Sequence, residues 1–211
     1  MPRHSENTRR TIIDSAYGLF YRKGFSRVGM DEIAAQSALT KRTLYYHYRS
    51  KDELLAAVLE HYHDLAMARI NGHAERYCGR VDEIIDAKFN DLVKWSKTPG
   101  WTGSGFTRMV MELADLPGHP ARDIAKRHKT ANQAWWEERY NESGIGSPQE
   151  RAREMSILME GAMALMLMSG DRSFAETAQK AAQTLLKAGA PVAKRRVSPR
   201  RVGPSKSPRP R

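Results

Sequence analysis

Residues 30–51 read MDEIAAQSALTKRTLYYHYRSK, and this stretch decides the fold of the chain. Its first eight residues place apolar or small side chains at i, i+3, i+4 and i+7, which lines them on one face of a helix. After a break at residues 37–39, Thr40 is suited to cap a second helix, in which Leu44 and Tyr48 lie one above the other. Two short helices joined by a tight turn form the outline of a helix-turn-helix.

The second of these helices has an outward face of cations, hydroxyls and rings, with no carboxylate. At about 100° per residue, Arg42 and Tyr46 lie nearly opposite Leu44. A lysine at a helix N-terminus opposes the helix dipole, so Lys51 indicates a role such as a phosphate contact. The sequence therefore predicts a nucleic-acid interface made by Thr40, Lys41, Arg42, Thr43, Tyr45, Tyr46, His47 and Lys51. The alternative, core aromatics in an ordinary helical hairpin, is disfavoured by the cations beside the rings.

The same stretch resembles the DNA-binding motif of the tetracycline-repressor (TetR) family. The resemblance rests on TLYYHY at residues 43–48, on SKDEL at residues 50–54, and on Ile12, Ala16, Leu19, Phe20, Gly24, Phe25, Ile33 and Ala34 ahead of them. It covers about the first quarter of the chain. Gly29 stands where the family usually has a Thr or Ser cap. Ala38 stands where it usually has a turn glycine, and a left-handed alanine there costs about 1 kcal/mol.

The resemblance implies a homodimer that binds double-stranded DNA at a palindromic operator and responds to a small-molecule ligand. In the family, the residues that match His47 and Lys51 approach the DNA backbone. A dimer is also expected from geometry, because one short recognition helix contacts too few bases and paired half-sites supply the rest.

The formal charge of +11 lies at the two ends of the 211-residue chain. Residues 1–50 carry nine Lys and Arg against four Asp and Glu, residues 51–190 carry eighteen against twenty, and residues 191–211 carry eight against none. We therefore expect a helix-turn-helix DNA-binding domain at 1–50 and a helical regulatory and dimerisation domain at 51–190. The remaining Pro-, Ser- and Arg-rich tail is expected to be disordered. It is either a sequence-independent contact with DNA or a solubilising end.

No strand pattern occurs, and about nine helices account for the chain, so we expect an all-α protein. Eight helices are expected at about 8–23, 30–37, 41–48, 81–97, 106–116, 121–142, 149–169 and 173–188. A further helix is expected from Lys51 towards Gly72, where it has a kink, ends or continues. Ser50 and Glu53 form a capping box that fixes the start at Lys51. Ser147 is expected to cap the helix that follows Pro148.

Apolar residues of the second domain support two further predictions. A ligand pocket is expected at Trp101, Phe106, Met109, Trp135 and Met163, with Trp136 nearby, although plain core is the competing interpretation for each. The methionines of residues 155–168 either are buried or line such a pocket. The last two helices are expected to pair with those of a second copy as a four-helix bundle, through Met155, Leu158, Ala162, Leu165, Ala178, Ala181 and Leu185.

The sequence contains no catalytic constellation, and its histidines are not spaced as metal ligands, so we expect no enzyme, no cofactor and no metal site. Cys78 is alone, which favours a reducing compartment. No secretory signal and no membrane span is recognisable, so we expect a cytoplasmic, nucleoid-associated protein without a membrane partner. The predicted function is a homodimeric transcriptional regulator, a repressor released from its operator by a small molecule. The alternative is an architectural DNA-binding protein that has no ligand.

Overall fold

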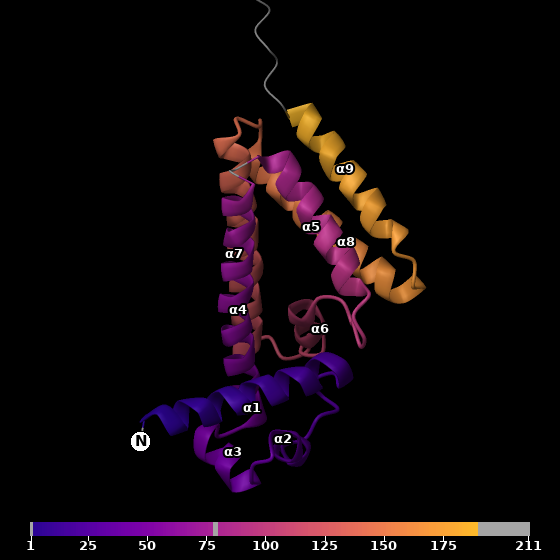
Figure 1. The fold of residues 1–211 in the computed structure, drawn as a ribbon. Coiled ribbons are helices and arrows are strands. Elements are labelled where there is room, and N and C mark those ends of the chain that lie inside the picture. Colours follow the sequence, from indigo (N-terminus) through magenta and orange to yellow (C-terminus); the bar gives the residue numbers. More distant parts are fainter. Residues whose placement is uncertain (1, 78–79, 190–211) are drawn as a thin grey trace, which may run out of the picture.

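Nine helices make up residues 2–77 and 80–189, the ranges that this computed structural model describes, and no strand occurs within them (Figure 1). The helices are α1 (Pro2–Lys23), α2 (Met30–Ser37), α3 (Lys41–His47), α4 (Lys51–Arg76), α5 (Val81–Ser96), α6 (Gly105–Met111), α7 (Pro120–Glu142), α8 (Pro148–Ser169) and α9 (Ser173–Gly189). The all-α prediction is confirmed. The predicted basic tail, residues 191–211, lies outside the described residues.

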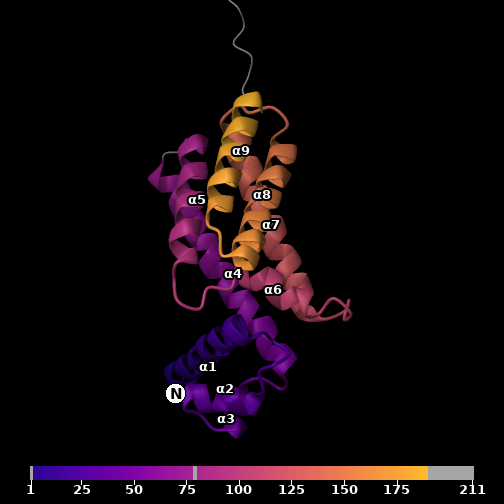
Figure 2. The same cartoon turned by 90° about the vertical axis from the view of Figure 1, so that its right-hand side faces the viewer.

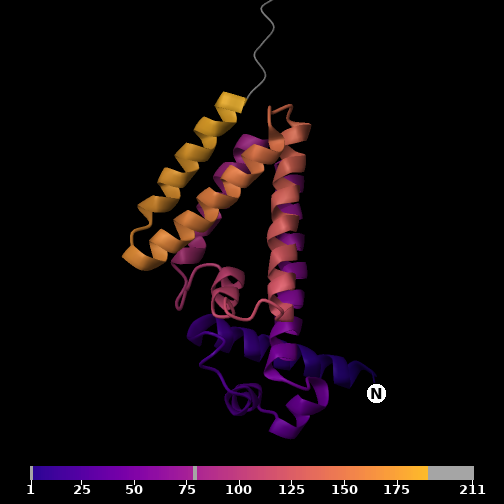
Figure 3. The same cartoon turned by 180° about the vertical axis from the view of Figure 1, so that it is seen from behind.

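The helices form a small N-terminal unit and a larger body. Helices α1, α2 and α3 lie together at one end, and α4 runs from them into the body alongside α7 (Figures 1 and 3). Helices α5, α8 and α9 are inclined to this pair, and α8 and α9 lie side by side on one face of the molecule (Figure 2). None of the helices within the described residues is both long and apolar enough to cross a membrane.

The core of the N-terminal unit forms because α1 carries an apolar stripe. Ile12, Ala16 and Phe20 follow one another at intervals of four and are fully buried. They belong to one cluster with Ile33 of α2 and Leu44 of α3. The helix-turn-helix is therefore held by the same stripes that the sequence pattern predicts.

This core continues beyond residue 50, where the sequence predicts a domain boundary. Leu55 and Leu59 of α4 are buried in it, and so are Met109 of α6 and Leu113 just after α6. Burial of two side chains such as Met109 and Leu113 contributes about 3–6 kcal/mol, which ties α6 to the N-terminal unit. The two units thus share α4 and are also joined through α6.

Helix α4 runs without a break to Arg76, past the possible stop at Gly72. Ile70 is buried in the core of the body, and Met67 and Tyr77 pack against the same cluster. These contacts outweigh the cost of a glycine within a helix, which is about 1 kcal/mol. The N-terminal unit is therefore connected to the body by one continuous helix.

Two other helix boundaries and one helix cap differ from the sequence prediction. Helix α1 begins at Pro2, because proline is tolerated in the first turn of a helix. Helix α6 ends at Met111 and not at Leu116, because the chain turns at Glu112. Ser147 occupies the N-cap position before Pro148, as predicted, but it is left-handed with φ 53° and its side chain makes no capping hydrogen bond.

Candidate nucleic-acid interface and cavity

The turn between α2 and α3 is closed by backbone hydrogen bonds. Ala38 adopts a left-handed conformation with φ 53°, and its N–H group donates to the carbonyl oxygens of Ala34 and Ala35. The Leu39 N–H group also donates to the Ala34 oxygen, at 3.0 Å. This pattern satisfies the free carbonyl groups at the end of α2 and fixes the direction in which α3 leaves.

Helix α3 has one buried side and one exposed side, as its sequence predicts. Leu44 is fully buried in the N-terminal core, whereas the Tyr46 side chain is 84% exposed. Lys41, Arg42 and Tyr45 are also exposed, so the predicted outward face is open to a binding partner. A large ring left exposed among cations gains little from folding, which favours a role in binding.

The first turn of α3 is ordered by its own hydroxyl groups. Thr40 caps the helix, because its Oγ1 accepts a hydrogen bond from the Thr43 N–H group at 3.1 Å. The two threonine hydroxyls lie 2.8 Å apart. Lys41 donates to Asp31 of α2 at 3.0 Å, and this hydrogen bond raises the pKa of Lys41. Lys41 is therefore charged but shared with a carboxylate, whereas the described residues give Arg42 no acid partner.

Arg9 joins the interface although sequence reasoning did not select it. Its guanidinium carbon lies 5.1 Å from the centre of the Tyr48 ring, so the first part of α1 reaches the end of α3. Burial, with a contribution from Arg9, lowers the pKa of His47, which therefore favours the neutral form near neutral pH. The sequence signal for Arg9 was the cluster of arginines at residues 3–10, but only the fold brings it to Tyr48.

Lys51 lies at the start of α4 and is half-buried. Its Nζ atom donates to the carbonyl oxygen of Phe25 at 3.2 Å and sits 4.3 Å from the centre of the Phe25 ring. The capping box predicted beside it forms, because Ser50 Oγ accepts from the Glu53 N–H group at 3.0 Å. The Glu53 carboxylate accepts from the Arg49 N–H group at 2.7 Å. Lys51 thus ties α4 to the loop before α2, and its phosphate contact stays a prediction.

A cavity of about 570 Å³ lies in the body between α4, α5, α6, α7 and α8, and residues of α1 also reach it. Tyr17 of α1 stacks on Tyr62 of α4 with ring centres 3.4 Å apart, and both rings line the cavity. Trp95, Phe106 and Trp136 supply further rings. This volume and this aromatic lining are within the range found for sites that bind drug-sized molecules.

One polar network crosses the wall of this cavity. The Glu160 carboxylate of α8 accepts from Thr107 Oγ1 at 2.7 Å and forms an ion pair with Lys129 of α7. His128 of α7 stacks on Phe106, with ring centres 3.8 Å apart, and its Nδ1 lies 3.1 Å from Nδ1 of His63. Burial lowers the pKa of His128 to about 4, and Lys129 and His63 contribute to this shift.

The predicted pocket residues are only partly brought together. Phe106 and Met163 line the cavity, and so does Trp136. Met109 does not, because it is fully buried in the N-terminal core. Trp135 is buried in the core of the body and Trp101 lines a separate hollow near Gly170, so both predictions are corrected. Of the methionines considered, Met155 and Met159 line the cavity together with Met163.

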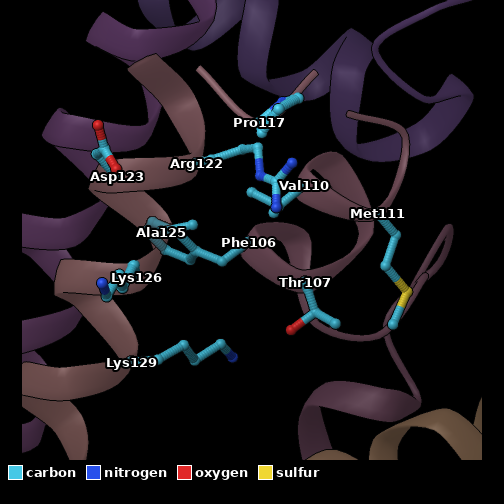
Figure 4. A pocket seen from close by; sticks show the side chains of 10 residues that line it. All are labelled: Phe106, Thr107, Val110, Met111, Pro117, Arg122, Asp123, Ala125, Lys126 and Lys129. Carbon is cyan, nitrogen blue, oxygen red and sulfur yellow. The ribbon is translucent and has the colours of Figure 1, made fainter. Parts of the chain in front are cut away.

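A surface groove of about 480 Å³ lies on the other side of the same wall, between α6 and α7 (Figure 4). The groove and the cavity share Phe106, Lys126 and Lys129. Figure 4 shows Lys129 extending from α7 towards Thr107 and Arg122 extending towards the end of α6. The groove and the cavity are therefore adjacent along these shared side chains.

Helix α6 connects the cavity wall to the N-terminal unit. Phe106 lines the cavity, and Thr107 donates to Glu160 of its wall. The Glu112 carboxylate just after α6 accepts from the Phe25 N–H group at 3.2 Å and the Ser26 N–H group at 2.8 Å. A Cβ atom on Gly24 would lie 2.5 Å from a Glu112 oxygen, and Gly24 also has a positive φ of 92°. Only glycine therefore allows this close approach.

Helix α1 is tied to the same region from its C-terminal end. The Tyr21 hydroxyl donates to the Gly103 oxygen at 3.1 Å, and the Thr102 hydroxyl donates to the Tyr21 oxygen at 2.8 Å. Arg108 of α6 donates to this same Tyr21 oxygen at 2.9 Å. A shift of α6 would therefore be transmitted to α1, which packs on the helix-turn-helix.

The predicted dimer residues lie on two different sides of α8 and α9. Met155, Ala162 and Ala178 are buried in the core of their own chain, so they cannot face a partner. Leu158, Ala181 and Leu185 are half-buried and Leu165 is 43% exposed. The outer side of α8 contains residues that the prediction missed, Ile157 at 71% and Met168 at 82% exposure. We call Ile157, Leu165, Met168, Ala181 and Leu185 the outer apolar face.

Within residues 2–77 and 80–189, no three His, Cys, Asp or Glu side chains converge in a way that could hold a metal ion. His128 and Lys88, whose pKa values are lowered mainly by burial, both line the cavity. What the described residues offer is an exposed helix and a cavity, which are features of binding.

Comparisons with known proteins agree with this geometry. Residues 12–58 match the family described as "Bacterial regulatory proteins, tetR family". The chain is 38% identical over 127 residues to the HTH-type transcriptional repressor SCO4008 of Streptomyces coelicolor, which covers 58% of this chain and 64% of that protein. It is 30% identical over 98 residues to the HTH-type transcriptional regulator TtgR of Pseudomonas putida, which covers 44% of this chain and 47% of that protein. The chain thus spans about half the length of TtgR.

The likeness in three dimensions extends over nearly the whole molecule. The solved structure of SCO4454, a TetR-family transcriptional regulator from Streptomyces coelicolor, matches with a TM-score of 0.78 and 25% identity, covering 88% of this chain and 97% of that one. Fold and exposed helix together define a DNA-binding protein of the helix-turn-helix class, with a second helical unit. The family match over residues 12–58, the curated relatives and this solved structure all support a TetR-family transcriptional regulator.

Proposed function

We propose that this protein is a homodimeric repressor that binds operator DNA through α3 and is released by a small molecule in the cavity. The observation that carries the DNA-binding step is the exposed face of α3. Arg42 and Tyr46 point outward while Leu44 anchors the helix in the core. A guanidinium can donate two hydrogen bonds to a guanine, and the Thr40 and Thr43 hydroxyls suit phosphate oxygens.

The ligand-responsive part of this proposal is supported by the position of the cavity. Tyr17 of α1 lines it directly, and α6 connects its wall to Glu112, which holds the loop after α1. A ligand that moves α6 or the Tyr17–Tyr62 stack changes how the N-terminal unit sits on the body. To shift such an equilibrium from 1:99 to 99:1, the ligand must bind the released state about 5.5 kcal/mol more tightly.

The dimer is supported by the outer apolar face of α8 and α9. Ile157 and Met168 are large apolar side chains that their own chain leaves mostly exposed. Small residues such as Ala164 of α8 and Ala181 of α9 allow two helix pairs to approach closely. A second copy of the same face covers these side chains by a two-fold axis, which also pairs two α3 helices for a palindromic operator.

A second candidate is an architectural DNA-binding protein without a ligand. Its sequence support is the basic tail, which lies outside the described residues. The cavity of about 570 Å³ beside α1 favours the ligand-responsive repressor, because an architectural protein has no use for it. The two candidates also differ in base preference, which the following experiment measures.

The test is fluorescence anisotropy with a duplex selected from a random pool by the wild-type protein and with a scrambled duplex. Arg42→Ala should cost about 1–3 kcal/mol on the selected duplex and much less on the scrambled one, because base contacts carry the specificity. Lys51→Ala should weaken both duplexes alike if it contacts phosphate. Lys97→Ala, an exposed cation at the end of α5, is the control. An Arg42→Ala protein with the wild-type ratio of affinities would contradict the proposal.

A further inference from the structure

The cavity wall carries an excess of positive charge. Four cations line it, Arg69, Lys88, Lys126 and Lys129, against the single carboxylate of Glu160. Both oxygens of that carboxylate are in use, one towards Lys129 and the other towards a threonine hydroxyl. The wall therefore keeps three cations that no lining acid neutralises.

Two of these cations line the cavity from the neighbouring helices α4 and α5, close enough for their charges to interact. Lys88 lies on the apolar stripe of α5 with Ile84, Ile85 and Leu92, and Arg69 lies on α4. Within the described residues, Lys88 makes no hydrogen bond or ion pair. Burial lowers the pKa of Lys88, and the charge of Arg69 lowers it further. The negative charge of Asp91 raises this pKa, but it offsets only part of the decrease. The positive charges of Arg69 and Lys88 thus repel each other. An anion between them would offset this repulsion and the cost of burying the Lys88 charge.

The rest of the cavity is suited to an apolar or aromatic body. Five rings line it from the five helices α1, α4, α5, α6 and α7: Tyr17, Tyr62, Trp95, Phe106 and Trp136. Such rings bury a planar apolar molecule well and stack on its faces. The volume of about 570 Å³ holds a molecule of two or three fused or linked rings.

We propose that the cavity binds an organic anion, with an aromatic or apolar body among the rings and its acid group between Arg69 and Lys88. A carboxylate, a sulfonate and a phosphate share the chemistry that these two cations recognise. This inference rests on the proposed ligand-responsive function and specifies the class of ligand. A neutral or cationic aromatic molecule fits worse, because it removes water from both cations and supplies no opposite charge.

Entry from the surface groove fits the same charge pattern. Lys126 and Lys129 border both the groove and the cavity, and Lys126 is exposed. An anion is attracted to this wall before it reaches Arg69 and Lys88. The Lys129–Glu160 ion pair is partly exposed, so its opening costs little.

Two fluorescent probes test the proposal with the full-length protein. 1-Anilinonaphthalene-8-sulfonate and N-phenyl-1-naphthylamine differ by the sulfonate group alone. Hydrophobic burial by itself predicts tighter binding of the neutral amine, since that molecule is the more apolar. The proposal predicts the reverse, with the sulfonate bound at least about tenfold more tightly.

Substitutions locate the acid group. Lys88→Met and Arg69→Gln should each weaken binding of the sulfonate about tenfold and change binding of the neutral amine less than about twofold. Lys97→Met, an exposed lysine at the end of the same helix α5, should change neither. Circular dichroism confirms that each variant is folded, and Arg69→Gln removes only an exposed charge, so it remains informative if Lys88→Met is unstable.

Equal affinities for both probes, or unchanged sulfonate binding in folded Lys88→Met and Arg69→Gln, overturn the proposal. The same variants should keep sequence-specific DNA binding, because both residues are far from α3 in the chain and lie in the body. Loss of the sulfonate preference with DNA binding intact would reject only the ligand class. Absence of sequence-specific DNA binding in the wild type would reject the proposed function and leave the probe result standing.

Discussion

Ala38 has a backbone conformation that is unfavourable for a residue with a Cβ atom. It adopts the left-handed conformation with φ 53° and closes the turn between α2 and α3. This conformation brings the Cβ atom of an L-residue close to a carbonyl oxygen, which costs about 1–2 kcal/mol, whereas glycine has no such cost. The turn of the helix-turn-helix therefore carries local strain.

Ala38→Gly should raise the free energy of unfolding by about 1 kcal/mol, since it removes this strain. The matched control is Ala35→Gly, three residues earlier within α2, which should lower the stability by about 0.5–1 kcal/mol. Urea unfolding followed by circular dichroism measures both changes. A destabilised Ala38→Gly protein would show that the left-handed turn is not the state the chain adopts.

The sequence predicts the faces of α2 and α3 well because each face follows from the period of one helix. Leu44 is buried and Tyr46 is exposed, as 100° per residue requires. The environment of Lys51 and the approach of Arg9 to Tyr48 could not be predicted in this way. Both depend on how α1 and the loop after it pack on α3 and α4, and this packing leaves no periodic signal.

At the scale of elements, α4, α6 and α7 meet at the cavity wall. His63 of α4 and His128 of α7 lie with their Nδ1 atoms 3.1 Å apart, and His128 also stacks on Phe106 of α6. Burial, with help from Lys129 and His63, lowers the pKa of His128 to about 4. The neutral form is therefore the one that the folded protein accommodates.

This shift predicts how stability depends on pH. In the unfolded chain His128 binds a proton at about pH 6.5, whereas in the folded protein it does so only near pH 4. Between these values unfolding takes up a proton, so the free energy of unfolding falls as the pH is lowered from about 6.5 to about 4. The contribution is fully present above about pH 6.5.

His128→Gln removes this titration and should flatten the pH dependence, although it lowers stability at neutral pH through the lost stacking. Urea midpoints at about pH 7, 6 and 5 for both proteins provide the comparison. His63→Gln serves as the control that removes the neighbour and keeps the titrating group. If His128→Gln and the wild type lose stability in parallel, His128 is not the group responsible.

The boundaries of a helix were predictable only where a local sequence signal marks its start or its end. The Ser50–Glu53 capping box fixes the start of α4, and the structure places it there. No local signal at Gly72 could decide whether α4 stops, because burial of Ile70 in the body determines the outcome. Lys88 could have been found, since it is a cation on the apolar stripe of α5.

At the scale of the whole molecule, the proposed dimer would place two α3 helices on one operator. The sequence predicts that α8 and α9 form the interface but selects the wrong side of α8 for Met155 and Ala162. Both sides of this helix are apolar, so periodicity cannot tell the side that faces the core from the side that faces a partner. The exposures of Ile157 and Met168 make this distinction.

Ile157→Glu should give a folded monomer, because it places a charge at the centre of the outer apolar face without touching the core. Ala162→Glu should instead unfold or aggregate, because Ala162 is 4% exposed and the charge would be buried in its own chain. Ala134→Glu, at an exposed position of α7, is the control. Sedimentation velocity and circular dichroism read out both properties. If the Ile157→Glu protein stays dimeric, the dimer interface lies on another surface of the molecule.

Selection of DNA from a pool of random duplexes by the full-length protein tests the account most directly. Two α3 helices related by a two-fold axis should enrich an inverted repeat, with half-site centres about one helical turn, or a multiple of it, apart. The Arg42→Ala/Tyr46→Ala double variant should enrich no such repeat under the same conditions. Enrichment of no sequence by the wild type, or of the same repeat by the double variant, would contradict the account.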